Sequence, residues 1–302
     1  MLFQPRKLSI ALCALFFTLS AQAAKLSIVI DDFGYRPVEE NKVLQMPAAI
    51  SVAVLPNAPH AREMATKAHQ CGHEVLIHLP MAPLSKQPLE KDTLTPEMSS
   101  AEIARIIRDA TGKVPFAVGL NNHMGSKMTS SLSGMQKVMQ VLNQYNYYFL
   151  DSMTIGNSQS IPASQGTHVK VLKRRVFLDD SQNEAAIREQ FTRAVKLAQR
   201  DGYAIAIGHP HPTTVRVLQQ MLPSLPGDIT LVRPSQLLNE PLHQGSGVRP
   251  ATPAKPLPAK FSAPGVCKVR KPLPAIPQRR AVDLVIENVS ESKFIKQLGS
   301  LF

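Results

Sequence analysis

The feature that most constrains how this 302-residue chain can fold is a regular alternation of short apolar runs with longer segments of helical period. The runs are rich in β-branched residues and have the length of buried strands. Eight of them are predicted to be strands: Leu26–Ile30, Ile50–Leu55, Glu74–Leu79, Phe116–Leu120, Tyr147–Leu150, Arg175–Leu178, Ala204–Ile207 and Ile229–Val232. Strands that alternate with helices form a parallel sheet covered by helices, so the sequence predicts an α/β fold.

Six segments between these runs have the apolar spacing of amphipathic helices. They are Val38–Gln45, His60–Gln70, Ala101–Ala110, Ser133–Tyr145, Asn183–Arg200 and Thr214–Leu222. Ser99 and Glu102 have the spacing of a capping box at the start of the third helix. The segment from Ser152 to Val169 has neither period, and we expect it to be mostly loop.

Polar side chains gather where the predicted strands end. They are Asp31, Asp32, His78, Asn121, Asn122, His123, Asp151, Asp179, Asp180 and His209. In a parallel barrel every carboxyl end opens onto one face, whereas a doubly wound sheet brings together only the residues at its switch point. Because so many consecutive units end in this way, we expect a (β/α) barrel of seven to eight units over residues 24–240.

The amino-terminal segment differs in composition from this body. Arg6 and Lys7 precede an apolar run from Leu8 to Leu19, and Ala21-Gln22-Ala23 follows with the small residues of a cleavage site. This order is typical of a signal peptide, which we place at residues 1–23. The apolar run is shorter than the roughly 20 residues that cross a bilayer, so we expect no membrane span and a periplasmic protein.

The net charge of +12 is concentrated at the other end of the chain. Residues 245–302 carry a net charge of +7, whereas residues 24–244 carry only +3. Residues 241–302 are rich in Pro and Lys, and we expect a disordered basic tail that is a linker or attaches to an acidic envelope partner. Because the body is nearly balanced in charge, no nucleic-acid partner is expected.

Two adjacent carboxylates, Asp31 and Asp32, follow the first predicted strand. Buried like charges repel each other and attract a cation or a proton, although the same pair also fits a turn that caps a helix. His78 and His123 each place an imidazole at the end of a strand. One carboxylate and two imidazoles leave a coordination position for water, so Asp32, His78 and His123 are predicted metal ligands. Asp31 then remains as a general base.

Other polar residues are expected to support this chemistry. His209 is positioned to protonate a leaving group, and His211 is an alternative that also fits the start of the next helix. Asp151 is expected to orient a catalytic histidine, and Asn122 and Ser152 to line the site. Asp179 is a further candidate for binding or support. Lys173-Arg174-Arg175 fits either a solvated run or a groove for a polyanion.

Five short motifs occur in a fixed order between Lys25 and Leu238. They are Ile30-Asp31-Asp32-Phe33-Gly34, His78-Leu79-Pro80-Met81, Asn121-Asn122-His123-Met124-Gly125-Ser126, Leu150-Asp151-Ser152 and Ile207-Gly208-His209. Together they resemble the divergent polysaccharide deacetylase family. The resemblance implies a deacetylase-like distorted barrel and a metal-dependent removal of N- or O-acetyl groups from an envelope glycan such as peptidoglycan.

The resemblance also implies a role for four residues. Asp31 corresponds to the base, Asp32 and His78 to metal ligands, and His209 to the general acid. The metal is expected to be zinc. Related deacetylases take both imidazoles from one H-x-x-x-H stretch, but here that stretch is interrupted by an alanine at position 82, and we infer that His123 supplies the missing ligand.

The predicted function is therefore that of a metal-dependent carbohydrate deacetylase acting on an amide or ester bond. One alternative is a non-catalytic envelope module that keeps the fold and binds a metal or a glycan. Another is a metal-independent glycosidase that pairs Asp31 with Asp151 or Asp179.

Overall fold

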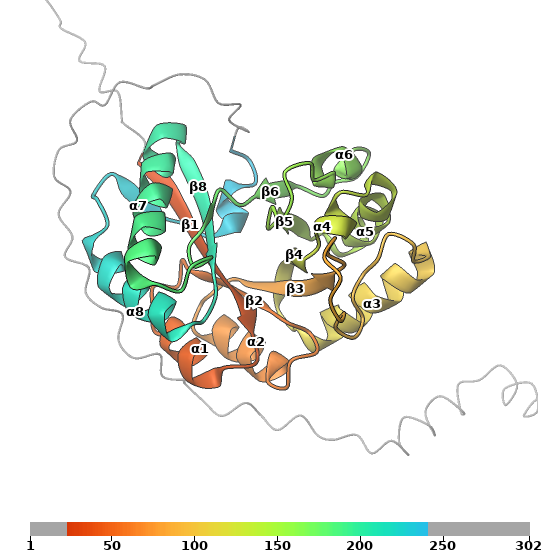
Figure 1. Ribbon diagram of the computed structural model, residues 1–302, viewed down its shortest axis with the longest axis horizontal. Helices are drawn as coiled ribbons and strands as arrows, with labels where there is room; N and C mark the ends of the chain where they lie inside the picture. Colours follow the sequence, from red (N-terminus) through yellow and green to blue (C-terminus); the bar gives the residue numbers. More distant parts are fainter. Residues whose placement is uncertain (1–22, 241–302) are drawn as a thin grey trace, which may run out of the picture. The chain divides into compact units, whose positions relative to one another are not determined.

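In the computed structural model, residues 23–240 are described, and they form a parallel sheet that curls around its own interior with helices on the outer side (Figure 1). The signal peptide predicted over residues 1–23 and the basic tail predicted over residues 241–302 lie outside the described residues, apart from residue 23. None of the helices described in residues 23–240 is both long and apolar enough to span a bilayer.

Nine strands pair in parallel in this sheet. They are β1 (Ala24–Phe33), β2 (Ser51–Val54), β3 (Val75–Met81), β4 (Ala117–Met124), β5 (Tyr148–Asp151), β6 (Val171–Lys173), β7 (Val176–Phe177), β8 (Tyr203–Gly208) and β9 (Ile229–Leu231). Eight of them follow the order β6-β5-β4-β3-β2-β1-β8-β7, and β9 pairs with the first residues of β1. The predicted α/β barrel fold is confirmed as a curled parallel sheet.

The helices connect these strands and cover the outer face of the sheet. They are α1 (Pro37–Val43), α2 (Ala61–Gln70), α3 (Ser100–Lys113), α4 (Ser126–Thr129), α5 (Leu132–Tyr145), α6 (Ser160–Ser164), α7 (Glu184–Asp201) and α8 (Pro212–Met221), with the 3-10 turns η1 (Leu222–Ser224) and η2 (Pro234–Leu237). Ser99 caps α3 because its Oγ accepts a hydrogen bond from Glu102 N at 3.2 Å, as the sequence predicts. All six predicted helices are present.

Alternation along the strands decides which side chains enter the interior of the curled sheet. In β8, Ala204 and Ala206 pack with the helices, whereas Ile205 and Ile207 join a separate apolar cluster inside the sheet. The interior cluster consists of Val29, Ala53, Leu76, Tyr148, Leu150, Leu172, Ile205, Ile207, Val232 and Leu237. Polar residues that follow these positions by an even number of residues therefore face the interior at the carboxyl end of the sheet.

The curled sheet has a seam where β6 and β7 form its two edges. β6 pairs with β5 and β7 pairs with β8, yet only Arg174 and Arg175 separate β6 from β7 along the chain. One extended segment thus changes partner strand at the seam.

Besides the two 3-10 turns, three short elements were not predicted from the sequence. β6 has three residues, α4 has four and α6 has five, the last within the segment expected to be loop. A strand of three residues or a helix of four or five residues is too short to show the period of its side chains in the sequence.

Candidate metal centre and active site

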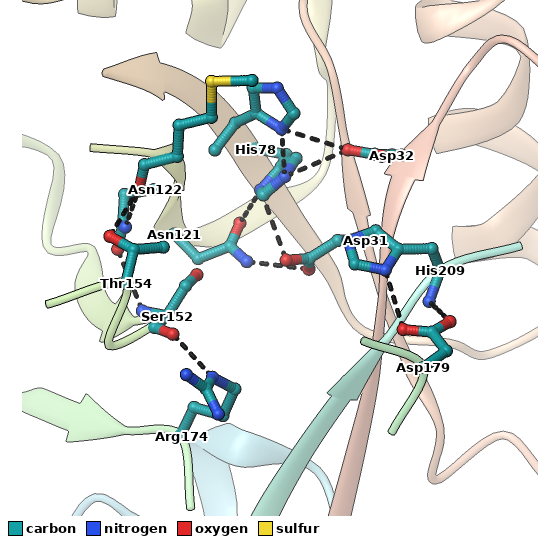
Figure 2. Close-up of polar contacts among 12 residues, drawn as sticks. Asp31, Asp32, His78, Asn121, Asn122, Ser152, Thr154, Arg174, Asp179 and His209 are labelled. Carbon is teal, nitrogen blue, oxygen red and sulfur yellow. Dashed lines mark hydrogen bonds and ion pairs between the residues drawn. The ribbon is translucent and has the colours of Figure 1, made fainter. Parts of the chain in front are cut away.

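Asp31 and Asp32 lie in a β-bulge at the end of β1. Between Ile30 and Phe33 the register with β2 slips by one residue, and Asp32 has a φ of +59°. In a regular strand two adjacent side chains point to opposite faces, but a bulge with a left-handed residue turns one of them. The bulge therefore lets both carboxylates approach one site (Figure 2).

The three predicted metal ligands meet at the carboxyl ends of β1, β3 and β4 (Figure 2). Asp32 Oδ1 lies 3.2 Å from His78 Nε2 and 3.2 Å from His123 Nδ1, and the two ring nitrogens are 3.0 Å apart. Two ligand atoms of a tetrahedral zinc ion, each about 2.0–2.1 Å from the metal, lie about 3.3 Å from each other. The three atoms therefore have the spacing that a zinc site requires.

Oxygen atoms lie on the far sides of the two imidazoles. His78 Nδ1 lies 2.8 Å from Asn121 Oδ1, and His123 Nε2 lies 3.3 Å from Glu90 Oε1. With a proton on each outer nitrogen, facing the Asn121 amide oxygen and the Glu90 carboxylate, each inner nitrogen presents its lone pair to the centre. Asp32 Oδ1 is also buried without an aligned hydrogen-bond donor. Three converging lone pairs fit a bound cation.

The electrostatics of this centre also favour positive charge. Burial raises the pKa of Asp32, but the close contacts with His123 and His78 outweigh it and hold the pKa well below its usual range. Burial lowers the pKa of His78, yet the charge of Asp31 and the contact with Asp32 reverse this effect and raise the pKa.

Asp31 lies beside the ligands and is fully buried within the site. Asn121 Nδ2 donates a hydrogen bond to Asp31 Oδ1 at 2.8 Å, and His78 Nδ1 lies 3.6 Å from the other carboxylate oxygen. Burial raises the pKa of Asp31, and the charges of His78 and His209 offset only part of this effect. A raised pKa makes the ionised carboxylate a stronger base.

His209 follows β8 and is oriented by Asp179. Its Nδ1 lies 2.9 Å from Asp179 Oδ1, and its backbone N–H donates to Asp179 Oδ2 at 2.6 Å. Thr214 Oγ1 donates to the same Oδ2 at 2.7 Å. Burial lowers the pKa of His209, but the Asp179 carboxylate outweighs it and raises the pKa to about 9. His209 therefore holds a proton at neutral pH.

Asp179, His209 and His211 form a second group whose ligand types fit a metal. Both oxygens of Asp179 already accept the hydrogen bonds described above. His211 Nδ1 lies 2.7 Å from Arg36 Nη1, and its Nε2 lies 3.3 Å from Gln182 Nε2. Because these atoms already have partners, this second group is better suited to hold a proton than a cation.

The remaining predicted residues lie around the site in different roles. Asp151 contacts no histidine among residues 23–240, because it accepts hydrogen bonds from Met153 N at 2.8 Å and from the hydroxyls of Ser158 and Ser160 at 2.5 Å. The expectation that it orients a catalytic histidine is therefore wrong. It fixes the loop after β5.

Asn122 and Ser152 connect the ends of β4 and β5. Asn122 Oδ1 accepts a hydrogen bond from Ser152 N at 2.9 Å, and Asn122 Nδ2 donates to Met124 O at 2.5 Å. Both side chains are buried beside the site.

The sequence predicts Asn121 at a strand end without a role, leaves two interpretations for the run that contains Arg174, and does not indicate Glu90. Asn121 directly precedes the predicted residues Asn122 and His123. It lies opposite His78 in the pairing of β3 with β4, which explains its hydrogen bond to that imidazole. Glu90 lies in the loop before α3, where no periodicity predicts its position. Arg174 lies at the seam, where its Nε donates to Ser152 O at 2.6 Å.

Comparison with known sequences identifies the family of this chain. Residues 28–238 match the divergent polysaccharide deacetylase family. The chain is 65% identical over 277 residues to the uncharacterized protein YibQ of Escherichia coli strain K12, covering 90% of this chain and 86% of that protein. It is 42% identical over 219 residues to an uncharacterized protein of Haemophilus influenzae strain Rd, covering 72% of this chain and 78% of the relative.

A solved structure shares the fold. The crystal structure of an uncharacterized protein from Agrobacterium tumefaciens C58 matches with a TM-score of 0.68 at 20% identity, covering 72% of this chain and 90% of that one. With the family match extending from β1 to η2, the chain belongs to the divergent polysaccharide deacetylase family.

Proposed function

We propose that this protein is a metal-dependent hydrolase that removes acetyl groups from an envelope carbohydrate. The observation that carries the proposal is the convergence of Asp32 Oδ1, His78 Nε2 and His123 Nδ1 within 3.0–3.2 Å of one another. Beside them lie a buried carboxylate, Asp31, and a protonated imidazole, His209, which are the base and the acid that such a reaction needs.

Zinc fits this centre because two imidazoles and one carboxylate are typical protein ligands of catalytic zinc, and they leave a coordination position open. When bound, the ion polarises the acyl carbonyl and lowers the pKa of water. Asp32, His78 and His123 would hold it, with Asn121 and Glu90 fixing the orientation of the two imidazoles.

Asp31 acts as the general base that takes a proton from the attacking water. Burial raises the pKa of its carboxylate, and the hydrogen bond from Asn121 keeps Asp31 Oδ1 in place. The base is therefore positioned and stronger than an exposed aspartate.

His209 acts as the general acid that gives a proton to the departing amine or hydroxyl. The Asp179 carboxylate keeps this imidazole protonated and fixes the ring through Nδ1, which leaves Nε2 to donate. The pair of a buried base and a protonated acid gives the two proton transfers of amide or ester hydrolysis.

The test measures acetate released by the purified, zinc-loaded protein from N-acetylated chitooligosaccharides and from acetylated envelope glycans. We expect release by the wild-type protein and its loss in Asp31→Asn, with bound zinc retained. Asp180→Asn is the matched control, because Asp180 is exposed and precedes α7. Retained zinc without acetate release from any glycan would contradict the proposal and favour a non-catalytic module that binds a metal or a glycan.

A further inference from the structure

The seam of the sheet turns one arginine of the Lys173-Arg174-Arg175 run toward the site. Arg174 N donates a hydrogen bond to the last carbonyl of β5 at 2.9 Å, and Arg175 N donates to a carbonyl of β8 at 2.8 Å. The side chains then diverge. Arg175 pairs with Asp201 at 2.8 Å, whereas Arg174 lies beside Ser152 (Figure 2).

The guanidinium of Arg174 is held in place but keeps part of its binding capacity. Its Nε and Nη2 donate to the carbonyls of Ser152 and Met153 at 2.6 and 2.9 Å, and its Cζ lies 4.3 Å from the centre of the Phe177 ring. Within residues 23–240 the side chain has no ion pair, and Nη1 makes no hydrogen bond. The carboxylates of Asp151, Asp31 and Asp180 favour its positive charge from a distance, without a direct contact. The half-buried guanidinium is thus held in place, and its Nη1 can still donate to a ligand.

Ser152, whose backbone carbonyl holds this cation, carries a second unused donor on its side chain. Its side chain is 2% exposed, and its Oγ is buried without a hydrogen-bond partner. Ser152 follows Leu150 by two residues, so its side chain faces the interior. Figure 2 shows Ser152 between Asn121 and Arg174. A buried hydroxyl without a partner indicates that a ligand group is expected there.

We infer that Arg174 and Ser152 form a subsite for a carboxylate carried by the carbohydrate substrate. The inference rests on the proposed function and deepens it, because it names an acidic sugar, such as a hexuronic acid, as the substrate class. One carboxylate oxygen would accept from Arg174 Nη1 and the other from Ser152 Oγ. A planar guanidinium matches the geometry of a carboxylate, and such charge-assisted hydrogen bonds are stronger than neutral ones.

The position of Phe177 connects this subsite to the chemistry. The Phe177 ring that lies 4.3 Å from the Arg174 guanidinium also stacks on His209, with ring centres 5.5 Å apart. The carboxylate would therefore bind close to the sugar that receives the proton from His209. The acidic sugar would then be the acetylated sugar itself or the sugar next to it.

The test uses hyaluronan tetrasaccharide, which carries both N-acetyl groups and hexuronates, and the same oligosaccharide after carboxyl reduction. Binding is measured by calorimetry on zinc-loaded protein with the Asp31→Asn substitution, which prevents turnover. We expect the charged probe to bind about tenfold more tightly than the reduced probe. Arg174→Gln should remove this preference, Arg174→Lys should keep part of it, and Ser152→Ala should reduce it.

Lys173→Gln is the matched control, since it removes the same charge one residue away and should leave the preference unchanged. Equal affinity for both probes, or binding of neither, in the protein that retains Arg174 overturns the inference. An Arg174→Gln variant that weakens both probes equally also overturns it, because Arg174 would then contribute to binding without recognising a carboxylate. Acetate release from neutral chitotetraose is measured separately, so failure of the proposed reaction is distinguishable from failure of the subsite.

Discussion

Two groups of one aspartate and two histidines lie at the carboxyl end of the same sheet, and they differ in what their polar atoms already bind. In the first, one ligand atom each of Asp32, His78 and His123 lies within 3.0–3.2 Å of the other two. In the second, Asp179 accepts three hydrogen bonds, two of them from His209. The first group therefore suits a cation and the second suits a proton.

The comparison shows that residue types alone do not decide between a metal site and an acid. Hydrogen bonds on the outer side of each imidazole set the tautomer and so the direction of its lone pair. Asn121 and Glu90 turn the lone pairs of the first group inward. Asp179 instead contacts Nδ1 of His209 and raises the pKa of His209 to about 9.

The largest expected effect distinguishes the two groups by metal binding. Asp32→Asn or His123→Ala should weaken zinc binding by more than about a hundredfold, because each removes a direct ligand, and even outer partners account for about 10–100-fold. His211→Ala should leave zinc affinity unchanged. Zinc binding of all three variants is measured as the metal content after dialysis and by competition with a chelator. Loss of zinc in His211→Ala with retention in His123→Ala would reverse the assignment of the two groups.

The second prediction concerns the proton held by His209. Asp179→Asn removes the charge that raises the pKa of His209, so the imidazole should lose its proton at a lower pH. The alkaline limb of acetate release should move down from about pH 9, and the rate at pH 8 should fall by about a hundredfold, within the range of general acid catalysis. The pH profile of the rate measures the shift.

NMR titration of His209 gives an independent readout of the same change. Because the pKa of His209 in the folded protein is raised above the ordinary imidazole value of 6.5, proton binding stabilises the fold below pH 6.5, and this contribution is lost as the pH rises through about 9. Asp180→Asn should change neither the titration nor the rate. An unchanged pKa of His209 in Asp179→Asn would show that another group sets it.

Much of this arrangement follows from alternation along the strands. His209 follows the interior residue Ile207 by two positions, so its direction can be predicted from the sequence once the strand is recognised. The same rule explains the wrong expectation for Asp151, which follows the interior residue Leu150 by one position and thus faces the helices. Applied to each strand end, the period of two separates the site residues from those that fix loops.

Three features could not be predicted in this way. The bulge that turns Asp32 into the site depends on pairing between β1 and β2, which no local pattern encodes. Glu90 lies in a loop whose path is set by tertiary contacts. The inward direction of Arg174 depends on the change of partner strand between β6 and β7. In each case the information lies in long-range contacts and not in local period.

The smallest predicted effect tests whether Glu90 sets the lone pair of His123. Glu90→Gln keeps the size of the side chain but weakens its hold on the proton at His123 Nε2, which lies 3.3 Å from Glu90 Oε1. We expect zinc affinity to fall by about tenfold, as for other carboxylate partners of metal-binding histidines, and Glu90→Asp to recover part of it. Glu97→Gln is the matched control, because Glu97 lies in the same loop but pairs with Lys127 at the surface. Equal zinc affinity in Glu90→Gln and the wild-type protein would mean that His123 keeps its tautomer without Glu90, and that the strand register alone orients the first group.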